Sequence, residues 1–180
     1  MGNQSRKKIF VIGTGRSGTC WVGDVLGQHS EVHSYVEPRP VFDWVTQAAV
    51  CAREEPRLLP GIFSEYDRLY QEASPLHFAD KTHPCIWIAE KLAEHFPDAC
   101  FVGVTRDVEP TVASMLKHSG VRRWCEEWDR YEVPNRFLGV TQENLDWYRR
   151  ATVLERAWHV GTLIKSNWHD SNACSTHACC

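Results

Sequence analysis

Short apolar runs that end in turn residues are the clearest pattern in this chain. Residues 8–12 and 100–104 are apolar and β-branched, and each run leads into a turn and then a helical pattern. Residues 32–36, which end at Glu37-Pro38, and residues 78–80 are two further short segments that we interpret as strands. Such runs are typical of strands buried in a parallel sheet. We therefore predict four strands at these positions.

The segments between these runs carry helical patterns. We predict helices over residues 18–26 and 40–51, and a third that begins at Pro84, a residue suited to a first helical turn. Asp107 is a suitable N-cap for a further helix. Residues 53–74 are predicted to be a helical or loop insertion. The third helix has apolar residues at the spacing of one buried face: Cys85, Ile88, Ala89, Leu92, Ala93 and Phe96.

A helical pattern returns at Thr141, after a looser stretch that begins at Gly120. This pattern predicts one long amphipathic helix whose apolar stripe packs in the core. Residues 169–180 are predicted to be a frayed terminus, and a metal-binding tract is the less favoured alternative for the cysteines there. The stripe consists of Trp147, Ala151, Leu154, Trp158, Gly161, Ile164 and Trp168.

Strands that alternate with helices predict an α/β fold, a three-layer sandwich with a parallel central sheet and helices on both faces. No repeat or low-complexity linker divides the chain, and 180 residues suit one domain. We therefore interpret residues 1–180 as a single domain with its core at 7–168. In such sheets, ligands bind beyond the carboxyl ends of the strands.

Composition and charge restrict the possible partners. Hydrophobic residues make up 43% of the chain and the formal net charge is −3, so a globular protein is indicated and a nucleic-acid partner is not. No run approaches the ~18 apolar residues that a membrane helix needs. The eight cysteines form no CxxC pair and several lie in predicted core elements, so we expect a reducing, cytoplasmic location. The sequence gives no indication of oligomeric state.

A glycine-rich segment after the first strand carries the main candidate chemistry. Residues 13–21 read GTGRSGTCW and open the first predicted helix. Glycines allow the backbone N–H groups of such a turn to converge, and the helix N-terminus adds a partial positive charge. The segment therefore predicts a phosphate cradle, and the alternative is a turn that only joins a strand to a helix.

The phosphate loop of nucleoside-triphosphate enzymes has the form G-x-x-x-x-G-K-[ST]. Gly13 and Gly18 have its spacing, but Thr19 takes the place of the lysine and Cys20 that of the metal-binding hydroxyl. The cation here is Arg16, two residues before the second glycine. A P-loop kinase acting on a nucleotide or small molecule therefore remains only as an alternative.

The run from Arg16 to Trp21 resembles the 5′-phosphosulfate loop of the sulfotransferases that use 3′-phosphoadenosine-5′-phosphosulfate (PAPS). That loop has the form (Lys/Arg)-Ser-Gly-Thr-(Thr/Ser)-x, and the chain departs from it at Cys20, which offers only its backbone N–H. The family's 3′-phosphate site is an arginine at a strand end and a serine eight residues later, as at Arg106 and Ser114. The resemblance implies PAPS as co-substrate, no metal, and these binding residues: Gly15, Arg16, Ser17, Gly18, Thr19, Cys20, Trp21, Arg106 and Ser114. For Arg106 alone, the alternative is a surface ion pair with Asp107 or Glu109.

The resemblance also implies a reaction, transfer of the sulfuryl group of PAPS to a hydroxyl or amine of a small-molecule, glycan or lipid acceptor. Arg16 and Lys81 are the cations expected near the bridging oxygen of the donor. Glu37, in Val-Glu-Pro, resembles the base of carbohydrate-type and bacterial members, and His83, in Lys-Thr-His, resembles the base of cytosolic members. We favour Glu37, because the acidic-Lys-Thr segment at Asp80 also resembles the carbohydrate group.

Two further features bear on this interpretation. The resemblance covers residues 7–118, and the chain ends before the further core strand and closing segment that family members usually have. A truncated, non-catalytic PAPS-binding protein is therefore a second alternative. Trp124 and Trp128, with the nearby arginines, could line an acceptor cleft, although a half-buried helix face is the favoured interpretation.

Overall fold

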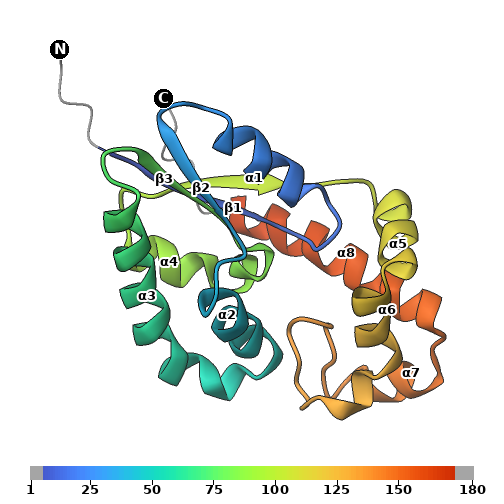
Figure 1. The fold of residues 1–180 in the computed structure, drawn as a ribbon. Coiled ribbons are helices and arrows are strands. Elements are labelled where there is room, and N and C mark those ends of the chain that lie inside the picture. The colour runs from blue at the N-terminus through green and yellow to red at the C-terminus, as the bar shows by residue number, and fades with distance from the viewer. Residues whose placement is uncertain (1–5, 173–180) are drawn as a thin grey trace.

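The computed structural model describes residues 6–172 of the chain, and the side chains of residues 6–163. Four strands form one sheet in the order β2-β3-β1-β4, and all neighbouring pairs are parallel (Figure 1). The strands are β1 (Lys8–Gly13), β2 (Val32–Val36), β3 (His77–Lys81) and β4 (Cys100–Val104). The four predicted strands and the α/β class are confirmed. Of the predicted tail, residues 173–180 lie outside the described part of the chain.

Helices cover both faces of the sheet. Helix α1 (Thr19–Gly27) lies on one face, where Gly23 approaches Lys81 so closely that a Cβ at this glycine would lie 2.9 Å from the lysine Cβ. Phe10 and Phe78 point to the other face and pack in the main core cluster. That face is covered by α2 (Val41–Val50), α3 (Glu55–Glu72), the 3-10 helix η2 (His83–Ile88) and α4 (Ala89–His95) (Figure 1).

The segment predicted as a helical or loop insertion is the 18-residue helix α3. Pro56 lies in its first turn, where a missing N–H costs nothing, and Pro60 lies inside the helix. Four side chains at helical spacing are buried, and their packing outweighs the hydrogen bond lost at Pro60. These are Leu58, Ile62, Tyr66 and Leu69.

The remaining helices form a second group beyond β4. They are α5 (Val108–Lys117), α6 (Ser119–Glu126), the 3-10 helix η3 (Trp128–Arg130), α7 (Leu145–Arg150) and α8 (Val153–Asn172). Asp107 occupies the cap position of α5 as predicted, but its side chain forms no capping bond there. Its backbone carbonyl instead accepts a hydrogen bond from Thr111 Oγ1 at 2.8 Å.

The prediction of a single long helix from Thr141 is wrong, because α7 ends at Arg150 and a separate helix, α8, begins at Val153. Thr152 and Glu155 form a reciprocal capping box: Glu155 Oε2 accepts from the Thr152 N–H at 2.7 Å, and Thr152 Oγ1 accepts from the Glu155 N–H at 3.3 Å. The predicted core stripe is buried only in part: Ala151 and Gly161 are buried, whereas Leu154 is 55% exposed and Trp158 44%. The side chains of Ile164 and Trp168 lie outside the described residues. Within residues 153–163 of α8, Ala157 and Val160 are also buried, although the predicted stripe does not include them.

The stretch from Tyr131 to Val140 connects this second group to the sheet side of the molecule. The Phe137 N–H donates to the carbonyl of Ala49 in α2, at 3.3 Å. Arg136 donates to the carbonyl of Ala48 at 2.9 Å and forms an ion pair with Glu55. These bonds hold Phe137 against the helices that cover the sheet. Across residues 6–172, no helix is both long and apolar enough to cross a membrane.

Candidate functional site

The glycine-rich segment lies at the carboxyl end of β1, the central strand that pairs with both β3 and β4. A Cβ at Gly13 would lie 2.5 Å from the Val104 carbonyl oxygen, so only glycine fits where the loop leaves the sheet. Ser17 folds the turn back on itself: its N–H and its hydroxyl both donate to the Thr14 carbonyl, at 3.2 and 2.8 Å. Gly18 has a φ of 106°, immediately before α1 begins.

Two residues of the site have strained backbones. Among residues 6–172, Arg16 (φ 74°) and Glu37 (φ 52°) are the non-glycine residues with positive φ. Such conformations are costly, and they gather at functional sites where the surrounding structure holds them. For Glu37, part of that support is a hydrogen bond from its N–H to the Lys81 carbonyl, at 2.9 Å.

The two segments that resemble phosphate-binding motifs meet in space. Arg16 Nε donates to Ser114 Oγ of α5 at 3.1 Å, although the two residues are 98 positions apart. Arg106 is exposed beyond the end of β4. In the part of the chain that the structure describes, Arg106 forms no ion pair with Asp107 or Glu109.

Glu37, Lys81 and His83 form one cluster beyond the ends of β2 and β3. Glu37 Oε1 accepts a hydrogen bond from the Lys81 ammonium and lies 2.9 Å from His83 Nδ1. Neighbouring parallel strands bring these groups together, because Val36 pairs with Lys81 in the β2–β3 register. The Lys81 side chain is only 2% exposed and that of Glu37 32%, so a buried cation faces a carboxylate at the surface.

Burial and hydrogen bonding set the charge states in this cluster. Burial alone would raise the pKa of Glu37, but hydrogen bonds from His83 and Lys81 and the lysine charge outweigh it and lower the pKa to about 2. Burial lowers the pKa of His83, against the opposing effect of Glu37. At neutral pH, Glu37 is therefore a carboxylate and His83 a neutral imidazole. With Glu37 as the acceptor, the ring proton resides on Nδ1 and leaves the Nε2 lone pair free.

The free nitrogen of His83 faces the glycine-rich loop. A Cβ at Gly15 would lie 3.4 Å from His83 Nε2, so a larger residue there would press on the ring. Two half-buried rings flank the imidazole: the ring centroid of Phe42 is 5.8 Å away and that of Phe137 is 6.4 Å away. Trp124 stacks on Tyr131 with centroids 4.4 Å apart, and Trp128 is buried in a second core cluster, which agrees with the half-buried helix face favoured from sequence.

A buried carboxylate behind this cluster has a partner that the sequence does not identify. Asp80 is 1% exposed, and its two oxygens accept hydrogen bonds from Tyr66 and Thr82, each at 3.0 Å. Burial raises the pKa of Asp80 to about 7, although these hydrogen bonds lower it. Tyr66 comes from α3, far from β3 in the sequence, so only the folded structure identifies it as the partner.

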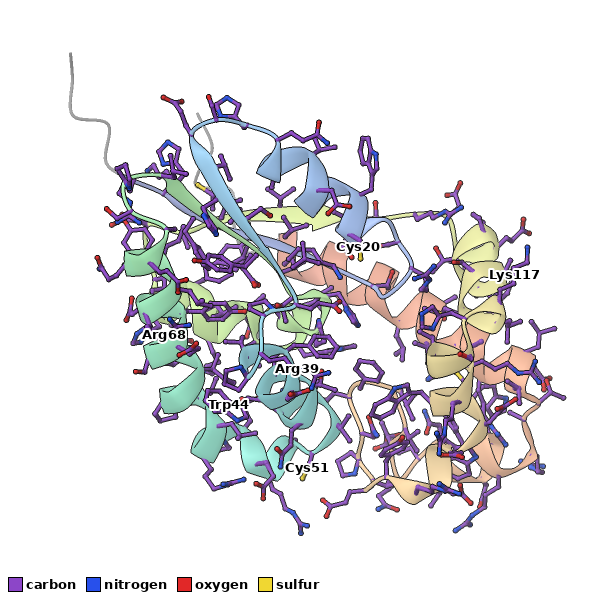
Figure 2. All side chains as sticks on the ribbon, in the orientation of Figure 1. Cys20, Arg39, Trp44, Cys51, Arg68 and Lys117 are labelled. Carbon is purple, nitrogen blue, oxygen red and sulfur yellow. The ribbon has the colours of Figure 1, made fainter. Side chains whose placement is uncertain are left out.

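The remaining predicted binding residues surround the loop. Thr19 is buried at the start of α1, whereas Trp21 is 70% exposed. Cys20, labelled in Figure 2, is exposed as well. None of the five described cysteines is in a disulfide. Across the described side chains, no group of three or more His, Cys, Asp or Glu residues is arranged to hold a metal ion. The sequence matches neither any protein-family model nor any curated protein.

Proposed function

We propose that this protein is a PAPS-dependent sulfotransferase of the P-loop-like type. The observation that carries the proposal is the hydrogen bond between Arg16 and Ser114 at 3.1 Å. PAPS has a phosphosulfate on its 5′ side and a phosphate on its 3′ side. A protein that binds PAPS therefore needs two anion sites about one nucleoside apart. The contact joins the segments that would form those two sites.

The loop is suited to the 5′-phosphosulfate. Its backbone turns through Arg16 and Gly18 into the N-terminus of α1, where N–H groups and the helix dipole favour an anion. The Arg16 guanidinium adds a full positive charge, and Ser17 and Thr19 fix the turn from the buried side. Arg106, exposed and without an ion-pair partner among the described residues, is available to the 3′-phosphate together with Ser114.

His83 is the better-supported base, with Glu37 as the residue that orients it. The sequence favours Glu37, but a carboxylate with a pKa of about 2 that also pairs with Lys81 is a weak proton acceptor. A neutral imidazole whose Nδ1 proton is held by a carboxylate has its Nε2 lone pair ready to accept a proton. Both residues therefore take part, in different roles.

The transfer then follows from these positions. His83 Nε2 accepts the proton of the acceptor hydroxyl or amine as that atom forms a bond to sulfur. The bond from sulfur to the bridging phosphate oxygen breaks, and the 3′,5′-bisphosphate product (PAP) leaves with the electron pair. Arg16 stabilises the charge that develops on this oxygen. Lys81, whose ammonium binds Glu37 beside His83, adds a second cation.

The kinase alternative has less support. At the position where a P-loop lysine would hold the β- and γ-phosphates, Thr19 is 2% exposed, and exposed Cys20 replaces the metal-binding hydroxyl. The non-catalytic alternative predicts PAPS binding without transfer. An assay with radiolabelled PAPS distinguishes transfer from binding alone, when PAPS is offered with phenol, sugar and lipid-alcohol acceptors and with water alone. We expect the wild type to form labelled product or to release labelled sulfate, and we expect His83→Ala to abolish both. Binding of PAPS without any transfer of the label would support the non-catalytic alternative.

A further inference from the structure

Asp80 is a buried carboxylate held by neutral donors. One oxygen accepts from the Tyr66 hydroxyl and the other from the Thr82 hydroxyl, both at 3.0 Å. The Tyr66 oxygen also lies 3.0 Å from Cys85 Sγ, so helix α3, the end of β3 and η2 meet at one buried point. Within the described residues, no arginine or lysine donates to Asp80. A buried carboxylate that binds no cation is costly, and its cost requires an explanation.

The position of Asp80 in the strand links it to the reaction site. Side chains alternate along a strand, so Asp80 points to the α3 face and Lys81 points to the α1 face. The chain leaves the strand at Thr82, whose hydroxyl is tied back to Asp80, and the next residue is His83. Asp80 therefore fixes the path of the three residues that bring Lys81 and His83 to the same oxygen of Glu37.

We propose that Asp80 is a positioning residue for the reaction site, and that its carboxylate aligns Lys81 and His83 on Glu37 through Thr82 and Tyr66. The proposal rests on the sulfotransferase function above for its catalytic meaning, but the alignment itself is a property of the fold. The carboxylate form is the one that can accept from both hydroxyls at once. A protonated or amide group at this position keeps both contacts only if one of the two hydroxyls turns from donor to acceptor.

Protonation of Asp80 therefore changes the hydrogen bonds that hold Thr82 and Tyr66. The titratable groups around it are Tyr66 of α3, Cys85 of η2, the adjacent Lys81 and Tyr35, its register partner in β2, while its partner in β1 is the apolar Phe10. Burial raises the pKa values of Tyr35, Tyr66 and Cys85, so all three stay neutral near neutral pH. With a pKa of about 7, Asp80 is then the member of this group that changes charge in that range.

The test uses the tautomer of His83, read from ¹⁵N chemical shifts of the imidazole in the full chain and assigned with His83→Gln. In the wild type at pH 8 we expect the Nδ1–H form, and a loss of that form as the pH falls through about 7. Asp80→Asn should lose most of the Nδ1–H form at pH 8 and show no such transition. Tyr66→Phe should show a smaller loss. Tyr70→Phe is the matched control, since it removes a hydroxyl one helical turn away that binds the Arg6 carbonyl instead.

Turnover provides the second readout. We expect Asp80→Asn to lower kcat by about 10- to 100-fold with little change in KM for PAPS, because the donor loop is untouched. If Asp80→Asn melts earlier but keeps the wild-type tautomer and its pH dependence, Asp80 is only a stabilising residue and the proposal is overturned. If the tautomer changes as expected while no variant transfers sulfate, the positioning role stands and the proposed function fails.

Discussion

Glu37 Oε1 lies 2.9 Å from His83 Nδ1, and the same oxygen binds the ammonium of Lys81. This one carboxylate oxygen therefore connects the ends of β2 and β3 beside the glycine-rich loop. The two residues that compete for the role of base when only the sequence is considered are partners in the structure. Their contact assigns the proton to Nδ1 and directs Nε2 to the side of Gly15.

Glu37→Gln should leave the donor site intact and impair transfer. The amide cannot compensate the buried Lys81 charge, and it no longer holds His83 in one tautomer. We expect kcat to fall by about 100-fold or more, with PAP affinity within about two-fold of the wild type. Initial rates with radiolabelled PAPS and calorimetry with PAP measure the two quantities. If Glu37→Gln and His83→Ala both keep near-normal turnover, neither residue is the base.

Arg16 and Ser114 should be coupled in nucleotide binding. Arg16→Ala removes a charge-assisted contact and should weaken PAP binding by about 2 kcal/mol, and Ser114→Ala should cost about 1 kcal/mol. Since the two side chains share a hydrogen bond, the double variant should deviate from the sum of the single variants by about 0.5 kcal/mol or more. Calorimetric titration with PAP closes this cycle. Strict additivity would separate the two residues into independent sites.

Gly13→Ala should destabilise the fold at the point where the loop leaves β1. Its Cβ would lie 2.5 Å from the Val104 carbonyl oxygen, and a backbone atom in a central strand pair cannot move away cheaply. We expect a loss of about 2 kcal/mol or more in unfolding free energy. Gly61→Ala in α3 is the matched control, because its Cβ would lie 3.6 Å from Trp44, at ordinary contact distance (Figure 2). This control should be neutral or stabilising by up to about 1 kcal/mol.

The unfolding free energy should depend on pH through Asp80. Burial raises its pKa from 3.8 to about 7, so between those values the folded state holds a proton that the unfolded chain has released. Stability from this group therefore falls as the pH rises from about 4 to 7, by at most about 1.4 kcal/mol per pH unit. Asp80→Asn should remove that dependence, as urea unfolding at pH 5, 6 and 7 would measure. Glu37 acts in a separate window, since its lowered pKa affects stability only below about pH 4.5.

Thr152→Ala should weaken the start of α8. The substitution removes the hydroxyl that accepts from the Glu155 N–H, at a cost of about 1 kcal/mol. Thr152→Ser keeps the acceptor and is the control. Equal unfolding midpoints for the two variants would show that the capping box contributes nothing to stability.

The strands could be predicted from the sequence, because their boundaries depend on local signals. Residues 32–36 and 100–104 end at turn or cap residues, and the structure places β2 and β4 at those positions. Thr152 and Glu155 have the spacing of a capping box, which is a local signal for the start of α8. The apolar spacing that continues through them favours one helix instead, and this is the interpretation that the structure contradicts. The exposed Leu154 and Trp158, beside the buried Ala151 and Gly161, show that this spacing identified the buried face only in part.

The site could be predicted residue by residue but not as an arrangement. Glu37 and His83 were both identified, yet their contact depends on β2 lying beside β3, and strand order is a property of the whole sheet. Asp80 had a motif but no partner in the sequence, because Tyr66 reaches it from α3. Contacts between residues so far apart in the sequence depend on how the layers of the fold pack, and no short sequence pattern specifies that packing.

Donor binding is tested most directly by the change in melting temperature that PAP, PAPS and Mg-ATP each cause in the wild type and in Arg16→Ala. A ligand that binds only the native state adds about 2.7 kcal/mol of stability at a hundred times its Kd. We predict that PAP and PAPS raise the wild-type melting temperature by several degrees without added metal, and that Arg16→Ala removes most of this rise. A higher melting temperature with Mg-ATP alone, or no increase with PAP and PAPS, would contradict the proposal that this protein binds PAPS.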